Sequence, residues 1–280
     1  MTGPPPFATI QPADLTAALG GRFVVDRKLG HGGQGAVYLA ECFDGPAIGK
    51  HVALKFYAPG GNDTRIEREV AALTTLSSDH LAAALDHGTV QLSGQDARWV
   101  AWQYVEGVSL RQSIQTGSRL SQADVMRMAR DVSRALECLW SSRIVHRDVK
   151  PDNLLLDVSS GDWILVDLGL ARFLNEPSIS AAGSACGTFG YMSPEQALGD
   201  HRLTSHSDVF ALGVTAIEGL LGTHPTQWRQ PPLMPPGSNI ALPHQAIPVL
   251  GPLLVKMVMH DPVARPTPTE IIAALEAHVP

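Results

Sequence analysis

The chain has 280 residues, enough for one large domain or two lobes with separate cores and too many for a short peptide-binding module. Hydrophobic residues make up 44% of the sequence, charged residues make up 17%, and the formal net charge is −6. These values argue against a disordered chain or one that coats nucleic acid. The three cysteines have no paired spacing, so we expect neither a disulfide framework nor a zinc site, and a reducing, cytoplasmic compartment.

The first 104 residues predict a small antiparallel sheet. Residues 1–19 are rich in proline and then in alanine, which favours a flexible leader that packs weakly on the rest of the chain. Four apolar segments suit β-strands: Phe23–Val25, Ala36–Ala40, His51–Tyr57 and Trp99–Val105. Between the third and fourth, residues 66–76 carry apolar side chains at helical spacing, which predicts one main helix beside the sheet.

The pattern becomes helical after Glu106 and Gly107. The segments Gln122–Arg143 and His206–Leu221 both predict long helices, the second largely buried, and the proline cluster Gln230–Pro236 predicts irregular surface. No apolar stretch approaches the roughly 18 residues of a membrane span, so we expect no membrane span in this chain. The sequence therefore predicts an α+β fold of two lobes, an antiparallel β N-lobe at residues 20–104 and a larger, mainly α-helical C-lobe at residues 105–278.

A glycine-dense turn lies between the first two predicted strands. The segment 29–37 contains the pattern G-x-G-x-x-G-x-V, which begins at Gly30 and in which glycines let backbone N–H groups approach phosphate oxygens without a Cβ in the way. The residues of the turn are Gly30, His31, Gly32, Gly33, Gln34 and Gly35. Taken alone this pattern is a weak signal, because glycine-rich turns are common.

Lys55 follows the apolar run Val52–Leu54 in the strand after this turn. A buried ammonium group needs an anionic partner, and Glu67 and Glu69 in the next predicted helix are the candidates. Glu69 is preferred, because it lies four residues before Leu73 and would share its inward face. The alternative is a solvated surface lysine, the usual environment of this residue type.

The most specific motif occupies residues 146–153, which read His-Arg-Asp-Val-Lys-Pro-Asp-Asn. It matches the catalytic loop H-R-D-x-x-x-x-N at every fixed position. Val-Asp-Leu-Gly at residues 166–169 stands where D-F-G is expected, and Met-Ser-Pro-Glu at residues 192–195 stands where A-P-E is expected. Residues 207–213 and 261–265 add the start of a central helix and a late arginine.

These ordered motifs resemble the protein kinase family over roughly residues 22–276. The fuller patterns G-H-G-G-Q-G and Y-M-S-P-E-Q look most like bacterial serine/threonine kinases of the eukaryotic type. The resemblance implies the bilobal kinase fold and transfer of the γ-phosphoryl group of ATP to serine and threonine hydroxyls of protein substrates. It also implies Mg²⁺ as the metal, with Mn²⁺ as an alternative.

By this resemblance, six residues take part in phosphoryl transfer. Asp148 would orient the substrate hydroxyl and accept its proton, and Lys150 would offset charge that develops on the γ-phosphate. Lys55, paired with Glu69, would bind the α- and β-phosphates. The predicted metal ligands are Asn153 and Asp167. Lysine at position 150 is the pattern of serine/threonine kinases.

The resemblance also assigns the nucleotide pocket. The glycine turn would cover the phosphates, and the adenine ring would lie between apolar walls with a few fixed polar groups. Val37, Ala53 and Leu155 would form the walls. Backbone groups of Gln103 and Val105 would bind the base. Trp102 resembles the gatekeeper at the rear of this pocket.

Further residues have supporting roles in the family. Glu195 and Arg265 are expected to form a buried ion pair. Asp208 is expected to accept hydrogen bonds from N–H groups of the catalytic loop. Thr188 would contact Asp148 and the catalytic-loop lysine.

The segment from Asp167 to Glu195 predicts regulation by autophosphorylation. A buried cation at Arg147 needs an anion, and a phosphorylated serine in this segment is the family's solution. We expect Ser184 first, four residues before Thr188, with Ser178 and Ser180 as secondary candidates, and self-association for phosphorylation in trans. The alternative is that all three are ordinary loop serines. Cys186 is interpreted as a small half-buried residue in preference to a redox switch.

Two competing functions are compatible with the same fold. A pseudokinase scaffold would bind nucleotide or partner proteins without catalysis, but it usually lacks the lysine or one of the two aspartates retained here as Lys55, Asp148 and Asp167. A small-molecule kinase would generally lack the Pro-Glu segment and the late arginine.

Overall fold

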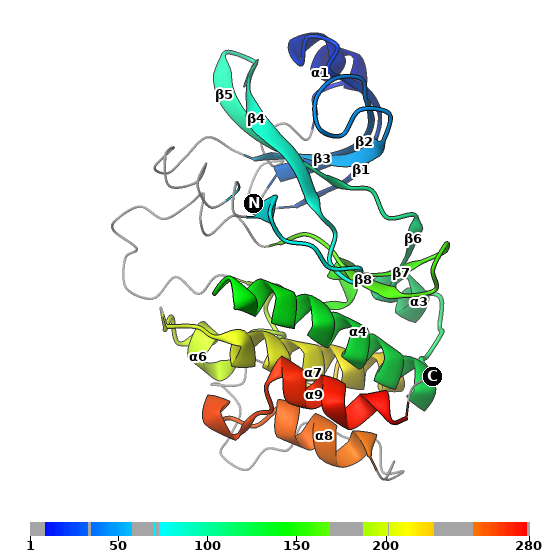
Figure 1. Ribbon diagram of the computed structural model, residues 1–280, viewed down its shortest axis with the longest axis vertical. Coiled ribbons are helices and arrows are strands. Elements are labelled where there is room, and N and C mark those ends of the chain that lie inside the picture. The colour runs from blue at the N-terminus through cyan, green and yellow to red at the C-terminus, as the bar shows by residue number, and fades with distance from the viewer. Residues whose placement is uncertain are drawn as a thin grey trace. The chain divides into compact units, whose positions relative to one another are not determined.

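The computed structural model describes residues 9–32, 35–57, 70, 73–168, 187–200, 202–226 and 249–278. Within these ranges the chain forms two compact units. The first contains the described residues up to Ser77 together with Ala82–Tyr104, and the second contains Ser78–Leu81 and the described residues of the ranges Val105–Gly169 and Ser180–Pro280. Figure 1 labels the elements of both units.

The first unit is built on a five-stranded antiparallel sheet with strand order β1-β2-β3-β5-β4. Its strands are β1 (Phe23–Gly32), β2 (Gly35–Cys42), β3 (His51–Tyr57), β4 (Ala84–Leu92) and β5 (Gln95–Gln103). The predicted antiparallel sheet is thus confirmed, and β4 is a strand that the sequence did not predict. Ser93 and Gly94, both with positive φ, form the two-residue turn that joins β4 to β5.

One face of this sheet forms the hydrophobic core of the unit. Alternate residues of β2 and β3 point into it, because successive side chains of a strand face opposite sides. The strand residues in this core include Tyr38, Val52, Leu54 and Phe56, all buried.

A short helix closes this core, where the sequence predicted a flexible leader. The helix α1 (Pro12–Ala18) begins with proline at its first turn, and Leu15 is fully buried in the sheet core. The Thr16 hydroxyl accepts a hydrogen bond from the Val25 N–H at 2.9 Å, which ties the helix to β1. The prediction of a weakly packed segment is therefore wrong for Pro12–Ala18, because burial of one leucine and a hydrogen bond outweigh its unfavourable composition.

The predicted main helix of the N-lobe falls mostly outside the described residues. Val70 and Leu73 are helical and buried within the described part. Glu67 and Glu69 lie outside the described residues, as does the proline cluster Gln230–Pro236.

The second unit combines a small sheet with a set of helices. The sheet has the antiparallel order β6-β7-β8, formed by Gly107–Ser109, Leu154–Asp157 and Trp163–Leu165. The α-helices described in this unit are α3 (Leu110–Gln115), α4 (Gln122–Ser141), α6 (Pro194–Ala197), α7 (Ser205–Leu221), α8 (Leu250–Met257) and α9 (Pro268–Glu276). Two 3₁₀ turns are η1 (Pro151–Asn153) and η3 (Pro262–Ala264).

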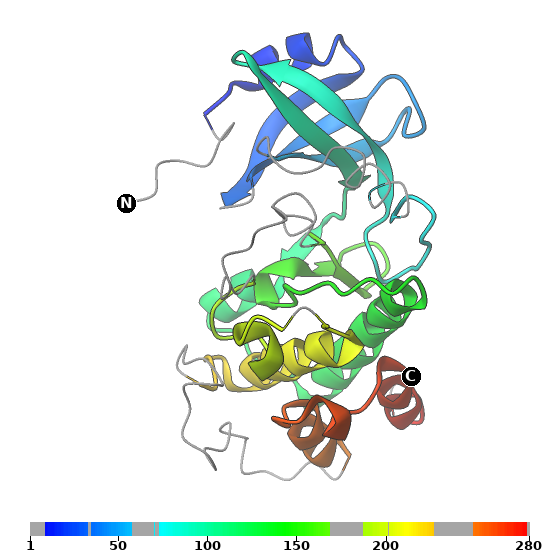
Figure 2. The same ribbon diagram turned by 90° about the vertical axis from the view of Figure 1, so that its left-hand side faces the viewer.

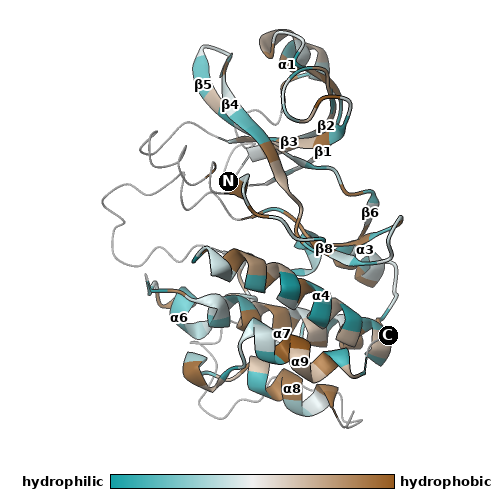
Figure 3. Cartoon of the chain, in the orientation of Figure 1, coloured by the Kyte–Doolittle hydropathy of each residue, from teal (hydrophilic) through white to brown (hydrophobic). Residues whose placement is uncertain are grey.

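The long helices of this unit lie side by side. In Figure 1 and in the turned view of Figure 2, α4 runs along α7 and α9, and these pairs are in contact. Figure 3 shows hydrophilic and hydrophobic residues alternating along α4, as expected for a helix with one face in a core. By contrast, α7 is buried along nearly its whole length, so both predicted long helices are confirmed, α4 ending two residues earlier than predicted and α7 starting one residue earlier. Within the described ranges, no helix is long and apolar enough to cross a bilayer.

The buried leucine of α1 gives a direct test of this packing. Leu15→Ala is expected to lower the free energy of unfolding by about 3 kcal/mol, because it leaves a cavity in the sheet core. Urea unfolding monitored by tryptophan fluorescence measures this change. The matched control is Val24→Ala on β1, where 44% of the side chain is exposed and the expected change is below about 0.5 kcal/mol. Equal effects of the two substitutions would contradict the docking of α1.

Candidate active site

The catalytic loop, residues 146–153, is fixed by the side chain of Asp208 on the buried helix α7. The Asp208 carboxylate accepts hydrogen bonds from the backbone N–H of His146 at 2.8 Å and of Arg147 at 2.7 Å. This confirms the expected role of Asp208. Burial raises the pKa of Asp208 to about 7, and the two N–H donors act in the opposite direction.

Arg147 holds a strained backbone conformation at this point, with φ of 69°. Its carbonyl group accepts a hydrogen bond from Nε2 of Gln196 at 2.8 Å. The N–H and the carbonyl of Arg147, the residue directly before Asp148, are thus both held by side chains of other elements. These two bonds together maintain its unusual conformation.

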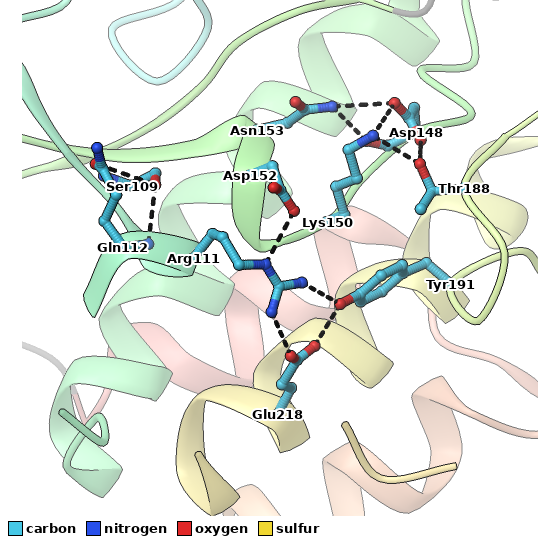
Figure 4. A network of polar contacts seen from close by, with 10 residues as sticks. All are labelled: Ser109, Arg111, Gln112, Asp148, Lys150, Asp152, Asn153, Thr188, Tyr191 and Glu218. Carbon is cyan, nitrogen blue, oxygen red and sulfur yellow. Dashed lines mark hydrogen bonds and ion pairs between the residues drawn. The ribbon is translucent and has the colours of Figure 1, made fainter. Parts of the chain in front are cut away.

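Asp148 is the centre of a compact hydrogen-bonded group (Figure 4). Nζ of Lys150 lies 2.7 Å from Oδ2 of Asp148, and the Thr188 hydroxyl donates to Oδ1 at 2.6 Å. Nζ of Lys150 also donates to the Thr188 hydroxyl oxygen at 2.6 Å, so the contacts expected for Thr188 are confirmed. The Asp148 residue is only 8% exposed, so its carboxylate is held by donors and not by bulk solvent.

Asn153 completes this group from η1. Its amide nitrogen donates to the backbone carbonyl of Asp148 at 2.8 Å and to Oδ2 of the same residue at 3.3 Å. The backbone carbonyl of Asn153 accepts from the N–H of Val166 at 2.9 Å, which ties the loop to the residue before Asp167.

Asp167 is half-buried and has a φ of 57°, so it is, like Arg147, a non-glycine residue in the left-handed region. Burial lowers the pKa of the fully buried His146. The negative charges of Asp148 and Asp167 act on this pKa in the opposite direction. The predicted metal ligands Asn153 and Asp167 belong to the same compact unit as Asp148 and Lys150. In the part of the chain that the structure describes, no group of three or more His, Cys, Asp or Glu side chains could hold a metal ion.

The first unit carries the other predicted residues on β2 and β3. Val37 is the register partner of Lys55, and both residues, with Ala53, lie on the face opposite the sheet core. Lys55 is only 4% exposed, and its ammonium lies 5.1 Å from the ring centre of Tyr57. The alternative of a solvated surface lysine is therefore wrong. The preferred partner of this lysine, Glu69, lies outside the described residues.

The glycine turn is a hairpin between β1 and β2, with Gly30 opposite Val37 and Gly32 opposite Gly35. His31 is exposed on this hairpin. A Cβ at Gly35 would lie 1.9 Å from the carbonyl oxygen of Phe56, so only glycine fits there. Gly33 and Gln34 lie outside the described residues.

The residues assigned to adenine are divided between the units. Gln103 uses its N–H to donate to the Ala83 carbonyl at 2.8 Å, so its carbonyl is the backbone group that could accept from a base. Trp102 and Val105 are buried. Leu155 is half-buried on β7.

The predicted ion pair of Glu195 and Arg265 is confirmed. Two parallel hydrogen bonds of 2.8 and 2.9 Å join the guanidinium to the carboxylate, and the Ser207 hydroxyl donates to the same carboxylate at 2.7 Å. Burial alone would raise the pKa of Glu195, but the bonds from Arg265 and Ser207 outweigh it and lower this pKa to about 2.

Sequence reasoning missed a network around Arg111 on α3. Arg111 contacts Tyr191 and Glu218, which lie 80 and 107 residues away along the chain. The sequence signal that could have indicated it is the tyrosine of the Y-M-S-P-E-Q pattern, whose function the pattern does not specify.

The fold and this site together define a protein kinase domain. The sequence matches the protein kinase domain family over residues 23–275, and the chain belongs to that family. The predicted family and the predicted bilobal α+β fold are therefore confirmed.

The particular relatives are bacterial serine/threonine-protein kinases. The chain is 34% identical over 212 residues to PknD of Mycobacterium tuberculosis, an alignment that covers 73% of this chain and 30% of PknD. It is 32% identical over 215 residues to PrkC of Bacillus subtilis, covering 74% of this chain and 31% of PrkC. The chain thus spans about a third of the length of these relatives. The crystal structure of the Mycobacterium tuberculosis PknI kinase domain matches with a TM-score of 0.70 and 25% identity, over 91% of this chain and 96% of that one.

The Glu195 ion pair predicts a pH dependence of stability. Because the pKa of Glu195 is lowered from 4.5 to about 2, its contribution is complete above about pH 4.5 and is lost as the pH falls toward 2. Glu195→Gln is expected to cost about 3 kcal/mol at pH 7, because it leaves the buried guanidinium without its anion, and less as the pH falls. Urea unfolding from pH 7 down to pH 3 measures this difference.

The control for this series is Glu276→Gln, which removes one partner of an exposed ion pair with Arg134. Such pairs contribute less than about 1 kcal/mol. A destabilisation by Glu195→Gln that is constant over the pH range would show that the carboxylate charge is not the source of the stability.

Proposed function

We propose that this chain transfers the γ-phosphoryl group of ATP to serine and threonine hydroxyls of proteins. The observation that supports this most strongly is the group in which Lys150, Thr188 and Asn153 all donate to Asp148. A carboxylate held in this way keeps its orientation and can still accept a further hydrogen bond from a substrate hydroxyl. Asp148 would orient that hydroxyl and take its proton.

Lys150 would supply positive charge beside the acceptor hydroxyl. Its ammonium already lies within hydrogen-bond distance of Asp148 and Thr188, so no rearrangement is needed to place a cation there. In the transition state this charge would offset the negative charge that develops on the transferred group.

Lys55 would bind the α- and β-phosphates, with Glu69 as its partner. Its burial favours this role over a solvated one, because a buried ammonium requires anions. Backbone N–H groups of the hairpin from Gly30 to Gly35 would cover the phosphates. Val37, Ala53 and Leu155 would contact the adenine faces, and backbone groups of Gln103 and Val105 would bind its edge.

Asn153 and Asp167 would hold Mg²⁺, or Mn²⁺ in its place. Because the amide nitrogen of Asn153 donates to Asp148, the atom that this side chain offers a metal is its amide oxygen. Asp167 supplies a half-buried carboxylate, and oxygen atoms of these two kinds are the ligands that Mg²⁺ prefers. When bound, the metal neutralises phosphate charge during transfer.

We further propose protein substrates, a cytoplasmic location, and self-association during autophosphorylation. A pseudokinase scaffold is not favoured, because Lys55, Asp148 and Asp167 are all retained. The lobe boundaries at residues 20–104 and 105–278 belong to the same proposal.

The phosphate-binding roles are tested by Lys55→Met and Asp167→Asn. Each is expected to lower kcat by at least about 100-fold, because each removes charge stabilisation from the transferring group. Transfer from radiolabelled ATP to a serine- and threonine-containing peptide library measures the rate, and circular dichroism verifies folding. The matched control is Lys50→Met, an exposed lysine just before β3, which should keep the wild-type rate. Near-normal rates in Lys55→Met or Asp167→Asn would refute these roles.

Autophosphorylation is tested in the segment 167–195. We expect the purified enzyme to carry phosphate at Ser184, with Ser178 and Ser180 as secondary sites, all outside the described residues. A phosphate at Ser184 would add nearly two negative charges, for which the Arg147 guanidinium is a suitable partner. Ser184→Ala and Arg147→Ala should therefore lower activity by similar and non-additive factors. An unmodified segment in fully active enzyme, shown by mass spectrometry, would exclude this regulation.

A further inference from the structure

A polar network around Arg111 joins four elements of the second unit (Figure 4). Nη1 of Arg111 donates to Oε1 of Glu218 on α7 at 2.8 Å, and Nη2 donates to the Tyr191 hydroxyl oxygen at 2.5 Å. Nε donates to Oδ2 of Asp152 on η1 at 3.2 Å. The Tyr191 hydroxyl in turn donates to Oε2 of Glu218 at 2.5 Å. One guanidinium thus connects α3 with α7, η1 and the segment after Thr188.

The backbone around Arg111 and the partners of its side chain are held in place by neighbouring contacts. Ser109 and Gln112 form a capping box at the start of α3, and Leu110 is fully buried, so the backbone on either side of Arg111 is fixed. The Glu218 side chain is only 2% exposed and requires a cationic partner. Burial and the bond to Glu218 both raise the pKa of Tyr191, which keeps its hydroxyl protonated and able to donate.

Tyr191 connects this network to the candidate active site. The backbone N–H of Tyr191 donates to the carbonyl of Thr188 at 3.1 Å, and positive φ angles at Gly187 and Gly190 shape the turn around Thr188. The Thr188 hydroxyl then contacts both Asp148 and Lys150. Glycine gives this turn little intrinsic rigidity, so contacts that hold Tyr191 can contribute to the position of Thr188 in addition to its own bonds to Asp148 and Lys150.

We propose that Arg111 is a positioning residue for phosphoryl transfer, acting through Tyr191 on Thr188. This inference rests on the proposed kinase function. Arg111 would hold the Tyr191 hydroxyl, and would thereby keep the Thr188 hydroxyl within hydrogen-bond distance of Asp148 and Lys150. The competing interpretation is that Arg111 only neutralises the buried charge of Glu218. The two differ in the effect of losing the Tyr191 hydroxyl while the Arg111–Glu218 ion pair remains.

The substitution Tyr191→Phe distinguishes these two interpretations. It removes the bridging hydroxyl and keeps the aromatic ring, which packs edge-on against His224 with ring centres 4.9 Å apart. We expect Tyr191→Phe and Arg111→Ala each to lower kcat for a peptide substrate on the order of tenfold, with KM for ATP changed less than about twofold. The double variant should lose no more than the stronger single variant, because both break one connection.

Two further variants sharpen the comparison. Arg111→Lys keeps the charge and is expected to recover part of the rate lost in Arg111→Ala. Arg134→Ala removes an arginine of α4 that forms an exposed ion pair with Glu276, and it should leave kcat unchanged. A wild-type kcat in folded Tyr191→Phe, or multiplicative losses in the double variant, would overturn the proposal.

Amide hydrogen exchange provides a measurement that does not depend on turnover. Arg111→Ala and Tyr191→Phe should both speed exchange on the order of tenfold at Thr188 to Met192 and leave the core of α4 unchanged. Unchanged protection at Thr188 to Met192 in both variants would overturn the proposed tether, even if the wild-type enzyme transferred no phosphate. Loss of wild-type transfer with the predicted exchange pattern would instead refute the kinase function and retain the tether.

Discussion

The hydrogen bonds from the backbone of His146 and Arg147 to Asp208 are the interaction on which the site depends. Asp208 belongs to α7, which is buried along nearly its whole length and therefore cannot shift without disrupting the core. The carboxylate fixes two consecutive peptide groups directly before Asp148 and stabilises the left-handed conformation of Arg147. The direction in which Asp148 points is set by this backbone geometry.

Other contacts hold the segment from Thr188 to Glu195, whose Thr188 hydroxyl contacts Asp148. Glu195 is anchored by Arg265 through a bidentate ion pair, which fixes the end of this segment on the helical core. Tyr191, held by Arg111, fixes the segment closer to Thr188. Each charged group in these contacts has a partner of opposite charge, and an unpaired charge in the same place would be strongly unfavourable. Stability and preorganisation of the site thus arise from the same bonds.

The sequence predicted the parts of this structure that are encoded locally. The residues around Asp148, and the roles of Asp208 and Glu195, lie in contiguous motifs whose spacing is diagnostic. It did not predict β4, because Asp86, His87 and Gly88 interrupt the apolar pattern of an edge strand.

Other features depended on contacts that no local pattern reveals. The helix α1 has seven residues, too few to be stable alone, and it forms because Leu15 packs on the sheet. The Arg111 network joins residues up to 107 positions apart, which no spacing rule covers. Glu69 and Ser184 lie outside the described residues, and their roles stay predictions.

In the proposed mechanism the Asp148 carboxylate, held in place by its donors, orients the acceptor hydroxyl. Asp148→Asn is nearly isosteric, but its amide cannot take the hydroxyl proton. Single-turnover transfer from radiolabelled ATP to a peptide acceptor, with the Kd for ATP measured on the same variant, tests this claim most directly. We expect a rate at least about 100-fold lower with an unchanged Kd for ATP. A wild-type rate of transfer in the Asp148→Asn enzyme would contradict it.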